Sequence, residues 1–170
     1  MEEKLTVNGK GYRVIRLLGK GKGGYSYLVT DGEKEFVLKQ IHHEPCDYYS
    51  FGNKLEAELH DYSRLRAAGI RIPELIDADA YYERILKEYV EGDTIAESIE
   101  KGVSVGEWIG EVTLMAEKAK AAGLNIDYYP TNFVPKDGRL YYIDYECNAY
   151  SEEWDLDHWG IGYWKDGHKE

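Results

Sequence analysis

Apolar and polar residues over positions 36–41 follow the two-residue period of a β-strand, with Val37, Lys39 and Ile41 on one face. Together with the residues before them, which are typical of strands separated by turns, they predict strands over residues 12–18, 25–30 and 35–41. Asn8-Gly9 and Asp31-Gly32 are dipeptides typical of tight hairpin turns, so we expect consecutive antiparallel strands here.

The period then changes to that of an amphipathic helix, which we predict over residues 51–68 with Gly69 ending it. Glu58 falls on the apolar stripe of this helix, whereas Glu56 lies off it. A buried carboxylate is costly unless it is paired with a positive charge. Glu58 therefore needs a basic partner, and Lys39 is the obvious one. Glu56 is the second choice for the glutamate that pairs with Lys39. The stripe consists of Leu55, Leu59, Tyr62 and Leu65.

Further elements follow in the second half of the chain. Residues 75–85 predict one or two strands, and residues 94–100 a short helix. Ser104, with Glu107 three residues later, has the spacing of a capping box that would start a longer helix ending at Gly123. The expected core face of that helix consists of Trp108, Ile109, Val112, Met115, Ala116 and Ala119.

Residues 125–146 predict a loop followed by a hairpin, with its turn at Lys136-Asp137-Gly138. Asp127 and Asn132 lie in the loop, and Asp144 ends the returning strand. Because a short hairpin brings the chain back to its start, we expect these three side chains to converge. Two carboxylates and an amide oxygen form a set of hard oxygen donors, which suits Mg²⁺.

Composition narrows the class of protein. A length of 170 residues fits one compact domain or two small lobes, and 43% hydrophobic residues are enough for a core. The net charge of −11 argues against nucleic acid as a partner. The start of the chain does not resemble a signal peptide, and no apolar run approaches membrane length, so we expect a cytoplasmic protein with no membrane partner.

Two cysteines, Cys46 and Cys147, provide neither a zinc spacing nor a disulfide framework, which favours a reducing compartment. His42-His43 lie near Cys46, but no second pair of ligands is close in the sequence. We therefore discount this group as a metal site.

Gly19, Gly21 and Gly24 match the pattern G-x-G-x-x-G. A dinucleotide-binding fingerprint would open into a helix, but here the pattern is followed by β-branched and aromatic residues and a hairpin turn. The loop therefore joins two strands. Glycines in such a loop allow backbone N–H groups to approach phosphates closely.

The spacing of Asp127, Asn132 and Asp144 resembles the catalytic loop and metal site of the protein-kinase-like superfamily. The resemblance implies that Asp127 is the catalytic base and that Asn132 and Asp144 bind Mg²⁺. Asn125 replaces the usual histidine of that family. Tyr145-Glu146 replaces Phe-Gly, as in aminoglycoside phosphotransferases and other small kinase-like enzymes.

The same resemblance assigns roles in the first half of the chain. The glycine loop, with Gly19, Gly21 and Gly24, would cover the phosphates of ATP. Lys39, fixed by Glu58, would hold those phosphates, and Val37 would touch the adenine ring. Residues 85–92 resemble the hinge between kinase lobes, in which the backbones of Glu88 and Val90 would bond the adenine edge; Lys87 stands at the gatekeeper position.

Only a short segment separates Asp144 from a stretch that resembles the start of the next large kinase helix. There Asp155 fits the aspartate that bonds the backbone of the catalytic loop, with Asp157 as an alternative. The activation segment is nearly absent, and the helices that usually complete the C-lobe are missing.

The resemblance implies an α+β, bilobal protein-kinase-like fold formed as a single domain over residues 1–170. We expect a five-stranded, antiparallel N-lobe over residues 1–88, a hinge over residues 88–92 and a truncated helical C-lobe over residues 93–170. RIO-type kinases, lipopolysaccharide-kinase-like proteins and aminoglycoside phosphotransferases are the most similar groups.

The implied activity is transfer of the ATP γ-phosphate, with Mg²⁺, to a hydroxyl group, and the leading form is an atypical serine/threonine protein kinase. A small-molecule kinase and a nucleotide-binding pseudokinase that acts as an interaction module remain alternatives. The hydroxyl acceptor and the oligomeric state stay open.

Overall fold

The computed structural model describes residues 3–21, 24–42 and 53–166. The predicted helix start at Phe51 lies outside these ranges, as do His43 and Cys46 of the discounted cluster. 

The chain divides into two compact units. The first unit consists of residues 1–60 and 73–89, and the second of residues 61–72 and 90–170. The boundary between residues 89 and 90 falls inside the expected hinge, residues 88–92. Residues 61–72, which we expected in the N-lobe, belong to the second unit, so helix α1 (Asn53–Ala68) begins in one unit and ends in the other.

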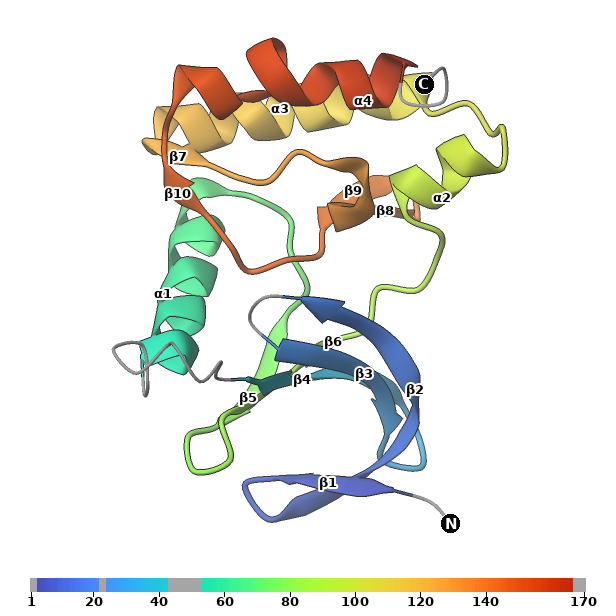
Figure 1. Ribbon diagram of the computed structural model, residues 1–170, viewed down its shortest axis with the longest axis vertical. Helices are drawn as coiled ribbons and strands as arrows, with labels where there is room; N and C mark the ends of the chain where they lie inside the picture. The colour runs from blue at the N-terminus through green and yellow to red at the C-terminus, as the bar shows by residue number, and fades with distance from the viewer. Residues whose placement is uncertain (1–2, 22–23, 43–52, 167–170) are drawn as a thin grey trace. The chain divides into compact units, whose positions relative to one another are not determined.

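The first unit contains a curled antiparallel sheet with the strand order β1-β2-β3-β4-β6-β5 (Figure 1). This sheet has six strands, so the expected number of five was wrong: the Asn8-Gly9 turn joins an additional strand, and residues 75–85 split into two. The strands are β1 (Lys4–Val7), β2 (Lys10–Gly21), β3 (Gly24–Thr30), β4 (Glu35–Ile41), β5 (Leu75–Asp79) and β6 (Arg84–Glu88).

Hydrogen bonds link the two outer parts of this sheet. Asn8, in the turn between β1 and β2, donates its backbone N–H to Asp79 Oδ2 at 2.8 Å and its Nδ2 to Asp77 Oδ1 at 2.8 Å. Because β1 and β5 are the two edge strands, these bonds hold the sheet in its curled form. The buried core on its inside consists of Val7, Tyr12, Val29, Leu38 and Leu86.

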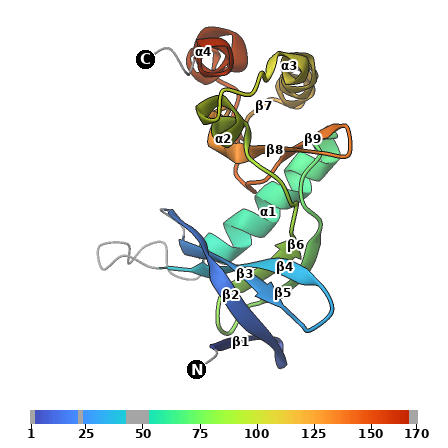
Figure 2. The same ribbon diagram turned by 90° about the vertical axis from the view of Figure 1, so that its right-hand side faces the viewer.

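The second unit combines helices with two small antiparallel ladders, β7–β10 and β8–β9. Helices α3 and α4 lie side by side in both views (Figures 1 and 2). The helices are α2 (Ile95–Glu100), α3 (Gly106–Ala121) and α4 (Ile161–Asp166), with helical turns η2 (Pro130–Asn132), η3 (Glu152–Trp154) and η4 (Leu156–Gly160). The strands are β7 (Leu124–Asn125), β8 (Phe133–Lys136), β9 (Arg139–Tyr142) and β10 (Asn148–Ala149).

The capping box predicted at Ser104 and Glu107 is wrong. Helix α3 begins at Gly106, and its N-cap residue Val105 makes no capping bond; Ser104, one residue earlier, accepts instead from the N–H of Gly106 through its Oγ at 3.4 Å. A capping box does form at the start of α2. There Thr94 Oγ1 accepts from the N–H of Glu97 at 3.0 Å, and Glu97 Oε1 accepts from the N–H of Thr94 at 2.8 Å.

The predicted hairpin at residues 133–143 is present as β8 and β9, with Lys136 paired to Arg139 across the turn. Phe133 and Tyr142 are fully buried, and Trp164 of α4 packs on Phe133 with ring centroids 5.1 Å apart. Helix α4 therefore covers the hairpin that follows the predicted catalytic loop. Among the helices of residues 53–166, none combines the length and the apolar character needed to cross a bilayer.

Candidate active site

A half-buried ion pair joins the centre of the sheet to helix α1 within the first unit. Lys39 Nζ lies 2.7 Å from Glu58 Oε1, and the two side chains are 16% and 9% exposed. Glu56 is exposed, so the pairing expected from the helical stripe is the one that forms. Glu58 Oε2 is buried without a hydrogen-bond partner among the described residues, which leaves the glutamate strongly dependent on Lys39.

The glycine-rich segment joins β2 to β3 as a hairpin, as its sequence context predicted, with Gly19 paired to Ser26 and Gly21 to Gly24. Gly24 has a φ of +154°, and a Cβ there would overlap the carbonyl of Gln40 in β4. Gly19 and Gly21 have open space around the Cβ position. Of these three glycines, the fold thus requires only Gly24. Gly19 and Gly21 have no such structural requirement, so they are candidates for contact with a ligand.

Of the residues expected to contact adenine, Glu88 ends β6 in the first unit, Val90 begins the second unit, and Val37 lies within the first unit. Val37 lies in β4 with Lys87 as its cross-strand neighbour, and Lys87 is buried. Glu88 donates its backbone N–H to the carbonyl of Glu74 at 2.9 Å. Val90 is buried at the start of the second unit. Their roles in nucleotide binding stay predictions.

Within the second unit, backbone and side-chain bonds bring the predicted catalytic residues together. Asn132 Nδ2 donates to the carbonyl of Asp127 at 3.2 Å, and the N–H of Ile143 donates to the carbonyl of Asn132 at 2.9 Å. Ile143 directly precedes Asp144, so the loop and the end of the hairpin are joined at this point. Asp127 is exposed, and its Oδ1 accepts from the N–H of Tyr129 at 3.1 Å.

Tyr142 is a buried support that sequence reasoning missed. Its hydroxyl accepts from the N–H of Asp127 at 3.2 Å and donates to the carbonyl of Glu146 at 2.8 Å. Burial, together with the nearby charge of Asp144, raises the pKa of Tyr142 well above 10, so the hydroxyl stays protonated and keeps both bonds. The alternation of Leu140 and Tyr142 on the inward face of β9 is a sequence signal for the burial of Tyr142, but not for its two hydrogen bonds.

The donor set around Asn132 and Asp144 fits a Mg²⁺ ion that takes its other ligands from water and phosphate. Asn132 uses its Nδ2 on the Asp127 carbonyl, which leaves Oδ1 as an acceptor. In residues 3–21, 24–42 and 53–166, the Asp144 carboxylate makes no hydrogen bond or ion pair, and no three His, Cys, Asp or Glu residues form a metal-binding group.

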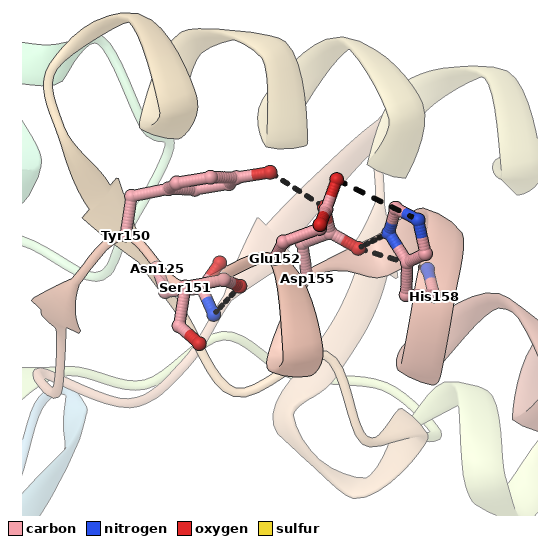
Figure 3. A network of polar contacts seen from close by, with 6 residues as sticks. All are labelled: Asn125, Tyr150, Ser151, Glu152, Asp155 and His158. Atoms are coloured by element: carbon pink, nitrogen blue, oxygen red, sulfur yellow. Dashed lines mark hydrogen bonds and ion pairs between the residues drawn. The ribbon is translucent and has the colours of Figure 1, made fainter.

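Asp155 caps η4 in a small polar network (Figure 3). Its Oδ1 accepts from the N–H of His158 at 2.8 Å and lies 2.9 Å from His158 Nδ1, while its Oδ2 accepts from the hydroxyl of Tyr150 at 2.7 Å. The resemblance implied a bond from Asp155 to the catalytic-loop backbone. In the described part of the chain its carboxylate instead bonds Tyr150 and His158, because a capping side chain faces its own helix.

In this network, the contact between Asp155 and His158 favours the charged form of each side chain. Burial disfavours the ionised form of Asp155, but the bonds from Tyr150 and His158 outweigh it, and the pKa of Asp155 lies below its ordinary value. The hydrogen bond to Asp155, with its charge, raises the pKa of His158 above 6.5. Asp157, the alternative residue, is exposed.

The predicted catalytic loop is anchored by α4 and η4 at Tyr128, the residue after Asp127. Trp164 Nε1 donates to the carbonyl of Tyr128 at 2.8 Å in a fully buried position. A Cβ at Gly160 would overlap the side chain of Tyr128, so glycine is needed for this close approach. No short sequence pattern marks these contacts, since Trp164 lies thirty-six positions from Tyr128.

Asn125, at the position of the usual kinase histidine, lies in the short ladder between β7 and β10. Its Nδ2 donates to the carbonyl of Ser151 at 3.3 Å (Figure 3), and its Oδ1 is buried without a partner among the described residues. The side chain thus ties the start of the catalytic loop to the segment before η3.

The segment after Asp144 packs on the second half of α1, inside the second unit. The rings of Tyr62 and Tyr145 lie 4.8 Å apart, and Asp61 and Arg64 contact the backbone of Cys147. Burial raises the pKa of the Cys147 thiol to about 11, which argues against a nucleophilic role for it.

No known family profile matches the chain. The chain is 27% identical over 147 residues to a protein of Bacillus subtilis (strain 168) with the name "Putative serine/threonine-protein kinase YrzF". The match covers 83% of this chain and 64% of that protein, so the chain spans less than two thirds of the length of this relative. The distant similarity indicates a kinase-like relationship, and the mixed α/β structure with its curled antiparallel sheet is compatible with the N-lobe of such a protein.

Proposed function

We propose that this kinase-like chain is a phosphotransferase that uses ATP and Mg²⁺ and transfers the γ-phosphate to a hydroxyl group, as an atypical serine/threonine protein kinase. The observation that carries the proposal is the ion pair between Lys39 and Glu58 at 2.7 Å. A lysine in the middle of a sheet, with a buried glutamate as its partner, is costly to desolvate and has little structural use. It has a clear use as a preset binding group for phosphates.

In the first unit, Glu58 fixes the direction of the Lys39 ammonium group through the 2.7 Å contact between them. Lys39 then binds the nucleotide phosphates without a further loss of side-chain freedom. Gly19 and Gly21, whose Cβ positions are open, allow the hairpin backbone to approach those phosphates.

In the second unit, Asn132 and Asp144 would hold Mg²⁺, which would supply positive charge to neutralise the phosphates. Asp127 orients the acceptor hydroxyl and takes its proton. A bond forms between the acceptor oxygen and the γ-phosphorus, the bond from that phosphorus to the β–γ bridging oxygen breaks, and ADP carries the released electron pair. Tyr142 and Trp164 position the loop through their bonds at Asp127 and Tyr128.

The name of the Bacillus relative supports a protein hydroxyl as the acceptor. Asp127 is exposed, so a side chain of another polypeptide can reach it. The short segment between Asp144 and η3 also leaves the loop uncovered by a long activation segment of this chain.

The proposal is tested by incubating the full chain with γ-labelled ATP, Mg²⁺ and the proteins of a cell extract. We expect label on acceptor proteins with the wild type and none above background with Lys39→Met. Binding of ATP without transfer to any acceptor would contradict the proposal and favour a nucleotide-binding interaction module. Label on small molecules alone would favour the small-molecule kinase.

A further inference from the structure

Four aromatic rings form a continuous edge-to-face series that starts in the catalytic loop. Tyr129 contacts Tyr163 at 5.0 Å between ring centroids, Tyr163 contacts Trp159 at 5.4 Å, and Trp159 contacts Trp154 at 5.7 Å. All four residues belong to the second unit, and Tyr129 is two residues from Asp127. We refer to these four residues as the aromatic ladder.

Three of the four ladder residues are exposed, Tyr129 by 42%, Tyr163 by 39% and Trp154 by 51%, and Trp159 is half-buried. The core of this unit uses other aromatic residues, such as Tyr128 and Trp164, which are almost fully buried. Adjacent exposed aromatic side chains are a common feature of binding surfaces, because they provide large contact areas with little loss of freedom.

The segment that carries three of the four ladder residues is acidic in sequence as far as Lys165, which is exposed and lies two positions after Tyr163. Residues 140–164 contain no lysine or arginine, and the single histidine among them, His158, bonds Asp155. Glu153 and Asp157 are exposed and lie beside Trp154 and Trp159 in the chain. The six acidic residues of this stretch are Asp144, Glu146, Glu152, Glu153, Asp155 and Asp157.

Aromatic faces within a negative field attract cations, and arginine most of all, since it both stacks on rings and pairs with carboxylates. A surface of this kind, next to the predicted catalytic loop, is suited to binding a basic polypeptide that carries the acceptor hydroxyl. This step rests on the proposed function, because it assigns the site of the acceptor in the phosphoryl transfer.

We propose that the aromatic ladder is the docking surface for a polypeptide acceptor rich in arginine and lysine, whose serine or threonine reaches Asp127. Successive rings are 5.0 to 5.7 Å apart. Side chains on one face of an extended peptide repeat at roughly 6.6–6.8 Å, so a peptide can place basic side chains along the ladder. Small molecules are held in enclosed pockets, whereas these rings lie open to solvent.

The test measures peptide binding by fluorescence anisotropy, independently of phosphoryl transfer. One labelled peptide carries a serine flanked by arginines, and a second has glutamine in place of each arginine. Variants Trp154→Ala and Glu153→Gln probe the rings and the charge, and Glu153→Gln changes no packing. The controls are Tyr81→Ala, a strongly exposed tyrosine of the first unit, and Glu117→Gln, an exposed glutamate of α3.

We expect the arginine peptide to bind more tightly than the glutamine peptide. Its affinity should fall as salt is added, because salt screens the charges. Trp154→Ala should lower its affinity roughly three- to tenfold. Glu153→Gln should lower it by a smaller factor, and neither control should change it. Equal binding of the two peptides, or wild-type affinity in both ladder variants, would overturn the ladder as a docking surface.

Transfer measured with the same two peptides separates this inference from the proposed function. Binding of the arginine peptide without transfer to any acceptor would refute the phosphotransferase and leave the ladder as a binding surface. Equal transfer to both peptides, unchanged by Trp154→Ala, would support the phosphotransferase and refute the ladder.

Discussion

Two glutamates in the first turns of α1 differ sharply in environment, although the sequence offered both as partners for Lys39. Glu58 is buried against Lys39, and Glu56 is exposed. The helical period distinguished them correctly, since burial on one face of a helix depends only on local spacing. The same reasoning could not identify Tyr142, because its role depends on hydrogen bonds to residues before and after its own strand.

Lys39→Met should lower the rate of phosphoryl transfer about 100-fold or more, because it removes a fixed positive charge from the phosphates. Glu58→Gln should also impair transfer, since the lysine loses its charged partner. Rates measured with saturating labelled ATP check both. Glu56→Gln is the matched control and should stay close to wild type; the opposite order of the two glutamates would contradict the assignment.

Gly24→Ala should destabilise the first unit, by about 1–3 kcal/mol from backbone strain alone. The added Cβ also overlaps the carbonyl of Gln40. Urea unfolding followed by circular dichroism measures the change. Gly21→Ala introduces the same methyl group into open space, so equal loss of stability in the two variants would show that the hairpin is described wrongly.

At the scale of elements, strands and helices could largely be predicted because their periods are local. The hairpin from Phe133 to Tyr142 and the amphipathic stripe of α1 were found in this way. The start of α3 was not predicted correctly. Ser104 is a residue type that favours capping, but it lies one position before the N-cap residue, Val105. The contacts of Asp155 were also unpredictable, since a capping carboxylate can face its own helix or a distant loop.

Trp164→Phe should weaken the anchor of the catalytic loop. The change keeps a ring in the core but leaves the buried carbonyl of Tyr128 without its donor, which costs about 1–3 kcal/mol. Denaturant unfolding measures this loss, and the rate of transfer should fall as well because the loop is less fixed. The exposed Trp154→Phe is the control for stability, and a loss as large as that of Trp164→Phe would contradict the special role of the buried bond.

The His158–Asp155 pair predicts a pH-dependent contribution to stability. The folded protein raises the pKa of His158, so its contribution is fully present below pH 6.5 and is lost as the pH rises through the raised value. The difference in Tm between wild type and His158→Gln should therefore be larger at pH 5.5–6 than near pH 9. A difference that grows with pH would mean that Asp155 does not bind the protonated imidazole.

For the molecule as a whole, the predicted roles are divided between two compact units, whose boundaries differ from those of the expected lobes at residues 61–72. Lys39 and Glu58 belong to the first unit, and Asp127, Asn132 and Asp144 to the second. The spacing within each group is short, which is why each could be recognised. The assignment of residues 61–72 to the second unit depends on contacts such as Tyr62 with Tyr145, which span more than eighty positions.

ATP with Mg²⁺ should raise the Tm more than ATP with EDTA, because a ligand that binds only the native state stabilises it by mass action. At a ligand concentration 100 times the Kd the gain is about 2.7 kcal/mol. Asp144→Ala should abolish the difference between the two conditions, as measured by differential scanning fluorimetry. A wild-type Mg²⁺-dependent shift in that variant would show that Asp144 does not hold the metal.

If Asp127 accepts a proton during phosphoryl transfer, the Asp127→Asn variant separates that role from nucleotide binding when its turnover and its ATP affinity are measured together. The variant keeps the size and hydrogen bonding of the side chain but cannot accept the proton. We predict that turnover falls about 10²–10⁴-fold while the Kd for ATP barely changes, since Lys39, Asn132 and Asp144 are untouched. Normal turnover in this variant would contradict the account, and a joint loss of turnover and ATP affinity would instead place Asp127 among the metal ligands.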